Sequence, residues 1–356
     1  MKRMRSVIPY LCFVLILALL LSSCTSSAKS RFWGRTVAPS DNVLKYISGS
    51  EPESLDPAIP NGQPEARILM ALYDGLIEYD PITMEPIPGL AESWEVKENG
   101  TEYIFHLRKN GKFSNGDPIT ANDFVYTIRR GFKPELASRN ASLGYYIKYS
   151  EAFNSNFAFV KGADGTFLLK KDFVEMVAGP ADAAVPAEDT AFHKYLDEPE
   201  RLAVPTVEKD RTKLLDSDPK LKAAVQGKEL VPVKAEDIGV EAIDDYTLRI
   251  KLYQPAPYFM GLLGHQFFRV VDQKVVEKFG DKWSRPENIV TSGSFRLVEH
   301  KPYDQLVVER DPMNWDAANV KLDRIEFYPL DEATTMMNLY VSGRIDATYN
   351  HTIPAP

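Results

Sequence analysis

The scarcity of cysteine is the feature that most constrains how this chain can fold. Its 356 residues include only two cysteines, Cys12 and Cys24. Cys12 lies in the apolar run VIPYLCFVLILALLL, which follows Lys2, Arg3 and Arg5 and precedes small residues, as in a secretory signal peptide. Cleavage just before Cys24 would leave a single cysteine, so no internal disulfide could form. A chain of this length can bury enough apolar surface without disulfides, and we expect a core built by burial alone.

Cys24 therefore needs an explanation other than a disulfide. Leu21-Ser22-Ser23-Cys24 resembles the lipobox of bacterial lipoproteins, in which the cysteine sulfur is acylated. Two or three acyl chains hold a protein durably on a membrane, since each buried methylene contributes about 0.8 kcal/mol. We expect residues 1–23 to be a lipoprotein signal peptide, Cys24 to be lipidated and residues 24–42 to form a flexible tether. The alternative is an ordinary signal peptide with a cysteine near its cleavage site.

The charge of the chain argues against a nucleic-acid partner. Residues 1–23 carry three basic groups and no acidic ones, so their removal changes the formal net charge from -8 to -11. Binding to nucleic acid requires a basic face. The full chain has 44% hydrophobic residues, and the part after residue 23 is typical of a globular protein large enough for two domains.

The sequence shows no constellation typical of an enzyme, a metal site or a nucleotide site. The histidines have no helical ligand spacing; they are His106, His193, His265, His300 and His351. Phosphate-binding glycine loops and the GxSxG elbow are also missing from the sequence. Asp244-Asp245 is a conceivable acid/base pair, but it separates two alternating segments, where aspartate is a normal turn residue. We expect no catalytic residues, no metal and no cofactor.

A regular series of secondary-structure signals begins at residue 43. VLKYISG alternates like a strand, and the proline-rich segment EPESLDPAIPNGQ follows as a loop. From Pro64 onward the apolar residues recur at helical spacing, and proline suits the first turn of a helix. Asn99-Gly100 separates two strand-like segments and predicts a hairpin. A second helix is predicted from Thr120, with Asp123 in its first turn and Gly131 at its end.

Two blocks of sequence carry a family resemblance. The first contains SLDPAIPNGQPEARILMALYDGLIEYDP, PIPGLAESWEV and YIFHLRKNGKFSNGDPITANDFVYTIRR. The second is VEAIDDYTLRIKLYQPAPYFMGLLGHQFFRVVDQKVVEKFGDKWSRPENIVTSGSFRL. Together they resemble the family 5 extracellular solute-binding proteins, the oligopeptide- and dipeptide-binding receptors of bacterial ABC importers. The resemblance covers about residues 43–150 and 236–350, with several motifs in the same order.

The resemblance implies a fold and a division into domains. The expected class is α/β, a type II periplasmic-binding-protein-like fold of two lobes with an inserted domain. Residues 43–75 and 236–300 are expected in the first lobe, and residues 76–235 in the inserted domain. Residues of about 150–235 match the family poorly and are expected to enlarge that domain. Residues 301–356 are expected to begin a second lobe that is incomplete, because family members usually continue for about two hundred residues.

The resemblance also implies ligand-binding residues. Asn61, Gly62 and Gln63 match a loop that lies beside the ligand in oligopeptide receptors, although Asn61 stands where an acidic residue is common. A simple turn before a helix is the alternative. Tyr145 and Tyr146, with Tyr149 nearby, fall where relatives carry aromatic residues near the ligand. Packing inside the inserted domain is the alternative for these tyrosines.

Ser292 and Gly293 are expected near the crossing between the lobes, where they would permit bending at a hinge. An ordinary bend in a strand is the alternative.

The implied function is that of a lipid-anchored, monomeric substrate-binding protein in the cell envelope. It would capture extended peptides through main-chain hydrogen bonds, which tolerate many side chains, and deliver them to ABC transporter permease subunits. The alternatives are a receptor for another solute such as a nickel complex or an oligosaccharide, a secreted hydrolase, and an adhesin-like or signalling lipoprotein.

Overall fold

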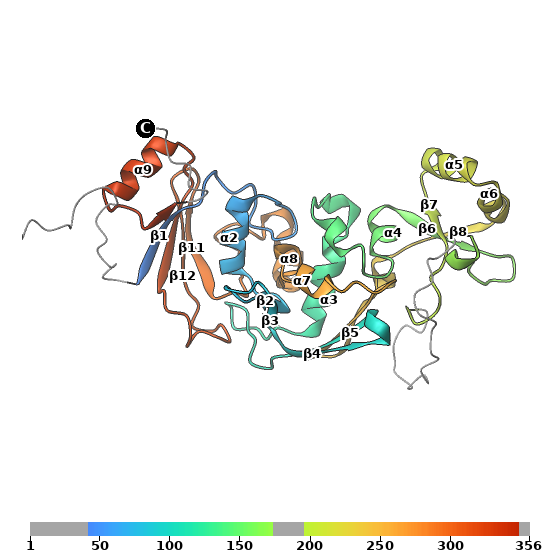
Figure 1. The fold of residues 1–356 in the computed structure, drawn as a ribbon, viewed down its shortest axis with the longest axis horizontal. Helices are drawn as coiled ribbons and strands as arrows, with labels where there is room; N and C mark the ends of the chain where they lie inside the picture. The colour runs from blue at the N-terminus through green and yellow to red at the C-terminus, as the bar shows by residue number, and fades with distance from the viewer. Residues whose placement is uncertain (1–41, 174–195, 349–356) are drawn as a thin grey trace, which may run out of the picture.

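The computed structural model describes residues 42–173 and 196–348. Figure 1 shows an elongated arrangement, with a five-stranded sheet at one end, a four-stranded sheet in the middle and a three-stranded sheet at the other end. Within these ranges no helix is both long and apolar enough to span a membrane. The predictions for the signal peptide and Cys24 lie outside the described residues.

The five-stranded sheet joins the first predicted strand to strands from the end of the chain. Its order is β11 (Phe295–Lys301), β12 (Gln305–Arg310), β13 (Arg324–Tyr328), β1 (Val43–Ile47) and β14 (Ala347–Thr348). β1 is parallel to both of its neighbours, β13 and β14. The helix α9 (Ala333–Val341) connects β13 to β14, so these elements form a βαβ unit with β1 lying between the two strands.

This pairing corrects the predicted start of the second lobe. Val43 pairs with Arg324 and Ile47 with Tyr328, so strands after residue 301 complete the sheet that β1 begins. The predicted boundary at residue 301 is therefore wrong for the described residues. The physical reason is that the backbone groups of β1 require hydrogen-bonding neighbours, and a parallel neighbour must come from a distant part of the chain.

The four-stranded sheet confirms the predicted hairpin and corrects a second boundary. Its order is β4 (Ala91–Lys97), β5 (Glu102–Leu107), β10 (Thr247–Lys251) and β9 (Val240–Asp244). Asn99 and Gly100 both have positive φ in the turn between β4 and β5. Asp244 closes the turn between β9 and β10, accepting hydrogen bonds from Tyr246 N and Thr247 Oγ1. Residues 240–251, predicted in the first lobe, thus belong to the sheet of the predicted inserted domain.

Helices and short strands link the two sheets through two apolar cores. They are α2 (Gln63–Leu72), α3 (Ala121–Gly131), α7 (Phe259–Leu262) and α8 (Gln273–Phe279), with the hairpin β2 (Ile77–Tyr79) and β3 (Pro86–Pro88). α3 begins after Thr120, whose backbone N–H donates to Asp123 at 2.8 Å, and ends at Gly131, as predicted. One core includes β5, β10 and α3, and the other includes α2, α8 and the five-stranded sheet.

The third part of the structure, here called the distal subdomain, comprises residues 150–173 and 196–235. It contains α4 (Ser150–Asn154), β6 (Phe157–Lys161), β7 (Ala203–Pro205), α5 (Glu208–Ser217), α6 (Pro219–Val225) and β8 (Glu229–Pro232). The strand order is β7-β6-β8. A small core of its own includes Val160 of β6, Val204 of β7 and Leu221 of α6.

Candidate functional site

The parallel strands of the five-stranded sheet indicate where a ligand site is expected. Open α/β sheets bind ligands outside the carboxyl ends of parallel strands. Ile47 and Tyr328 are register partners at the ends of β1 and β13, and Ser48 N donates to the Tyr328 carbonyl at 3.0 Å. Gly49, with φ 97°, then turns the chain away from the sheet. The segment that follows, residues 48–62, is called the β1–α2 loop; it is the candidate site.

A buried ionic contact anchors the middle of the β1–α2 loop. Asp56 is only 2% exposed, and its carboxylate forms a two-point ion pair with the Arg130 guanidinium of α3. Trp283 Nε1 also donates to Asp56, at 3.3 Å, and the Ala58 backbone N–H donates to it at 3.1 Å. A buried carboxylate is costly unless it is paired in this way. The contact fixes the loop to α3 and to the region after α8 at once.

Hydrogen bonds to carbonyl groups hold the end of the same loop. The Pro60 carbonyl accepts from Asn140 Nδ2 at 2.8 Å and from Gln266 Nε2 at 2.5 Å. The Ala58 carbonyl accepts from Ser138 Oγ at 2.5 Å. Both carbonyl groups are therefore satisfied by side chains, which fixes the backbone that leads into the next three residues.

Asn61 and Gly62 end the anchored loop, and together with Gln63, the first residue of α2, they form what is here called the loop tip. Asn61 and Gln63 are exposed, and Gly62, between them, is half-buried. A Cβ at Gly62 would collide with the carboxylate of Glu65, which is 5% exposed and accepts from the Glu53 backbone N–H at 2.9 Å. The tip offers two neutral amide side chains on a rigid support, able to donate and accept hydrogen bonds but carrying no charge.

The predicted ligand-binding tyrosines contact side chains of neighbouring segments. Tyr145 is half-buried and donates to Asn154 Oδ1 at 2.6 Å, and Tyr146 packs edge-on against Tyr258 with ring centroids 5.3 Å apart. These residues lie a few positions before α4. Their role in binding a ligand stays a prediction.

Tyr149 has a packing role. It is 5% exposed, stands edge-on to Phe159 at 4.9 Å and accepts a hydrogen bond from the Arg201 backbone N–H at 3.1 Å. Burial raises the pKa of its hydroxyl to about 12. The contacts of Tyr149 are those of a residue packed inside the protein.

Ser292 and Gly293 form a buried joint between α2 and β11. The backbone N–H groups of both residues donate to the Leu72 carbonyl, at 3.1 and 2.9 Å. A Cβ at Gly293 would lie 2.6 Å from the Ala71 carbonyl oxygen, so the close approach requires glycine. Bending at this joint stays a prediction, and these contacts favour a rigid connection in the conformation described.

Asp74, at the same joint, is a residue that the sequence analysis missed. Its carboxylate is 7% exposed and accepts hydrogen bonds from Asn314 Nδ2 at 2.9 Å and Trp315 Nε1 at 2.8 Å. Burial raises the pKa of Asp74 to about 6, with the nearby Glu78 acting in the same direction, while Arg269 and the two hydrogen bonds oppose the rise. The only signal in the sequence was an aspartate within the mostly apolar stretch LMALYDGLI.

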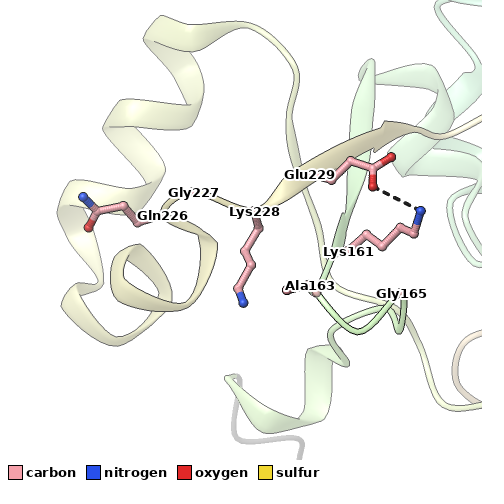
Figure 2. Close-up of a pocket in the computed structure, with 8 residues that line it drawn as sticks. Lys161, Ala163, Gly165, Gln226, Gly227, Lys228 and Glu229 are labelled. Atoms are coloured by element: carbon pink, nitrogen blue, oxygen red, sulfur yellow. Dashed lines mark ion pairs between the residues drawn. The ribbon is translucent and has the colours of Figure 1, made fainter.

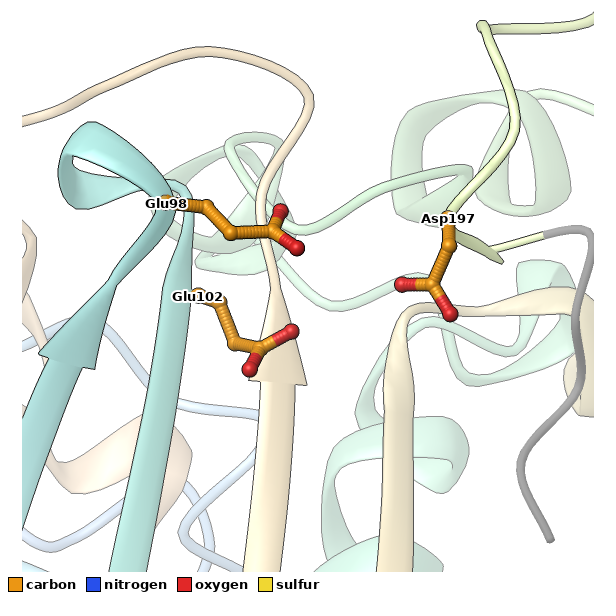
Figure 3. A group of neighbouring side chains, drawn as sticks. All are labelled: Glu98, Glu102 and Asp197. Atoms are coloured by element: carbon orange, nitrogen blue, oxygen red, sulfur yellow. The ribbon is translucent and has the colours of Figure 1, made fainter. Parts of the chain in front are cut away.

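One group of carboxylates invites comparison with a metal site. Figure 3 shows Glu98 and Glu102, near the β4–β5 turn, directed toward Asp197, and their oxygens lie within 4.8 Å of one another. Lys251 forms ion pairs with all three carboxylates, and Arg249 pairs with Glu102 and Asp197. The charge that a metal would supply is thus provided by side chains of the protein.

A polar groove of about 360 Å³ lies on the distal subdomain, remote from the β1–α2 loop (Figures 1 and 2). It is formed where the chain leaves β6 and enters β8, and Lys161 and Glu229 form an ion pair in its wall at 3.1 Å. Its lining has no convergent set of buried polar groups, and we assign it no ligand.

The fold is built on an α/β sheet with a candidate site at the carboxyl end of its parallel strands, and comparisons with known proteins specify the family. The family model described as "Bacterial extracellular solute-binding proteins, family 5 Middle" matches residues 85–355. The chain therefore belongs to the family 5 extracellular solute-binding proteins, as the sequence resemblance indicated.

Individual relatives agree with this assignment. The periplasmic oligopeptide-binding protein OppA of Salmonella typhimurium is 31% identical over 336 residues, covering 94% of this chain and 48% of that protein. The probable deoxycholate-binding periplasmic protein YgiS of Escherichia coli is 29% identical, covering 86% of this chain and 44% of that protein. The structure of Haemophilus influenzae OppA in complex with the peptide RPPGFSPFR is similar with a TM-score of 0.64 and 26% identity, covering 89% of this chain and 47% of that one. The chain spans about half the length of the curated relatives it matches.

Proposed function

We propose that this chain is the substrate-binding component of a peptide ABC importer and that the β1–α2 loop contacts the ligand. The observation that carries the proposal is a rigid loop, at the carboxyl end of a parallel strand, whose exposed tip bears the uncharged amides of Asn61 and Gln63. Amide groups on a fixed backbone suit an extended peptide, whose main chain alternates donors and acceptors. Several relatives are named for binding oligopeptides or dipeptides.

The proposal includes the finer features expected from the sequence. The protein is a monomer, is anchored through Cys24 to a membrane of the cell envelope, delivers its ligand to permease subunits, and performs no catalysis and uses no cofactor. ATP hydrolysis belongs to a separate subunit. Two relatives are named as periplasmic oligopeptide-binding proteins, and these names support a location in the cell envelope.

A second candidate ligand is an amphipathic solute other than a peptide. The relative named as a probable deoxycholate-binding protein supports this alternative within the same family. Deoxycholate carries one carboxylate and a large apolar surface, whereas the side chains exposed at the loop tip, Asn61 and Gln63, are neutral amides. We favour the peptide for that reason.

The test is incubation of the purified chain with a mixed peptide pool and, separately, with deoxycholate, followed by native mass spectrometry. We expect intact peptides to be retained. Replacing both amides, Asn61→Ala with Gln63→Ala, should weaken binding about tenfold, since each lost hydrogen bond costs about 0.5–1.5 kcal/mol. Asn122→Ala is the matched control, because Asn122 is an exposed amide on α3. Cleaved peptides would indicate a hydrolase, and retention of deoxycholate alone would favour the second candidate.

A further inference from the structure

Three buried cations meet at one end of the four-stranded sheet. Arg249 and Lys251 lie on β10, and Lys148 precedes α4. A backbone hydrogen bond holds Lys148 beside Lys251, since Lys148 N donates to the Lys251 carbonyl at 2.9 Å. Arg249 is 4% exposed, Lys251 is 6% exposed and Lys148 is 4% exposed. Burying cations this closely is unfavourable unless acceptors surround them.

Carboxylates of the sheet itself neutralise part of this buried positive charge. Glu102 of β5 and Glu241 of β9 pair with Arg249 at 2.7 and 3.1 Å, and Glu98 pairs with Lys251. These carboxylates neighbour Arg249 and Lys251 within the same sheet or its β4–β5 turn. None of these pairs involves Lys148.

Further acceptors come from three consecutive residues, Leu196 to Glu198, here called the strap. Asp197 pairs with Arg249 and, at 3.4 Å, with Lys251. Lys148 Nζ donates to the carbonyl oxygens of Leu196 and Glu198, both at 2.6 Å. The strap thus offers one carboxylate and the two flanking carbonyls to the three cations. Figure 3 shows Asp197 directed across toward the β4–β5 turn.

The opposite side of the strap is apolar and belongs to the distal subdomain. The Leu196 side chain is 1% exposed and packs in a cluster with Tyr149, Phe159 of β6 and Val233. The strap is therefore attached to the subdomain by burial of apolar surface, which salt does not screen. Its attachment to the sheet is by charge, which salt does screen where solvent has access. The Asp197 side chain is 45% exposed, so solvent reaches this attachment.

We propose that the strap is an electrostatic latch that locks the distal subdomain onto the four-stranded sheet and releases it when the contacts of Asp197 and Lys148 are broken. Burial, together with the nearby Lys251, lowers the pKa of Lys148 to about 8, while the acidic residues Glu200, Asp197 and Glu198 oppose this. The Lys148 ammonium is thus costly in this position, and the strap carbonyls offset part of that cost. On release, the subdomain remains joined to the sheet through the segment that leads into α4 and the segment that leads from β8 to β9.

The test is hydrogen exchange measured by mass spectrometry on the full chain and its variants. Asp197→Asn keeps the shape of the side chain and removes its charge. We expect exchange in residues 196–202 to become about tenfold faster, while exchange in β12 and β13 stays unchanged. Asp216→Asn is the matched control, because Asp216 is an exposed partner of Lys222 on the same subdomain. It should leave exchange in residues 196–202 as in the wild type.

A second variant, Lys148→Met, and a series of salt concentrations test the contacts of the strap independently. Lys148→Met removes the donor to both strap carbonyls and should accelerate exchange in the same segment. Raising sodium chloride from 50 mM to 1 M should accelerate that exchange in the wild type and have a smaller effect in Asp197→Asn. Wild-type protection in both variants would overturn the latch. So would equal acceleration in β12 and β13, since that result would show general loss of stability.

Discussion

The buried carboxylate of Asp74 gives a quantitative prediction about pH. Its pKa rises from an ordinary 3.8 to about 6 in the folded chain, so the native state binds the proton more tightly than the unfolded state. The stabilisation from this group is fully present below pH 3.8 and is lost as the pH rises through 6. At 1.36 kcal/mol per pH unit, the whole effect is about 3 kcal/mol, of which about 2 kcal/mol is lost between pH 4 and pH 7.5.

The perturbation is Asp74→Asn, which retains an acceptor oxygen for Asn314 and Trp315 but carries no charge. We expect the unfolding free energy of the variant, relative to the wild type, to increase by about 2 kcal/mol from pH 4 to pH 7.5. Urea denaturation followed by tryptophan fluorescence at constant ionic strength measures this difference. Asp331→Asn, at an exposed position, is the control and should follow the wild-type curve. A difference that is constant or decreases with rising pH would refute the reasoning.

Two further predictions concern the buried joint and the loop anchor. Gly293→Ala should cost roughly 1–3 kcal/mol in urea denaturation, because its Cβ would press on backbone atoms of α2 at 2.6 Å. Gly261→Ala, where nothing lies within 4 Å of the added Cβ, should change stability little, and equal losses in both variants would contradict the packing argument. Asp56→Ala should cost about 3–5 kcal/mol in the same assay, because it leaves Arg130 buried without its carboxylate. A loss below 1 kcal/mol would show that the anchor is not needed.

The sequence predicted local elements well where turn chemistry and periodicity agreed. Proline and the apolar spacing placed α2, and Asn99-Gly100 placed the hairpin of β4 and β5. Thr120 and Gly131 marked the ends of α3. In each case the information is local, because capping groups and left-handed turns act over a few residues.

The pairing of distant segments was less accessible to sequence reasoning. The joining of β1 with β13, and of β10 with β5, depends on contacts across more than one hundred residues, for which short-range patterns carry no signal. The predicted domain boundaries at residues 236 and 301 were inaccurate for this reason. The contacts of Asp74 and Lys148 were missed likewise, because burial of a charged residue depends on which segments fold against it.

The candidate site was predicted in part. The resemblance selected Asn61, Gly62 and Gln63, and the structure gives them an anchored, exposed position. Asp56, the residue that anchors the loop, is contained in the quoted motif SLDP, but its partners Arg130 and Trp283 come from segments far along the chain. The tyrosines were selected by the same resemblance, and their role in binding a ligand stays a prediction.

The most direct test of the central claim is a hydrogen-exchange footprint of bound peptide on the full chain. The account predicts that a peptide recovered from the mixed pool slows exchange in residues 48–63, and that Asn61→Ala with Gln63→Ala weakens this protection while Asn122→Ala does not. Protection confined to the groove between Lys161 and Lys228, or no protection of residues 48–63 at saturating peptide, would contradict it.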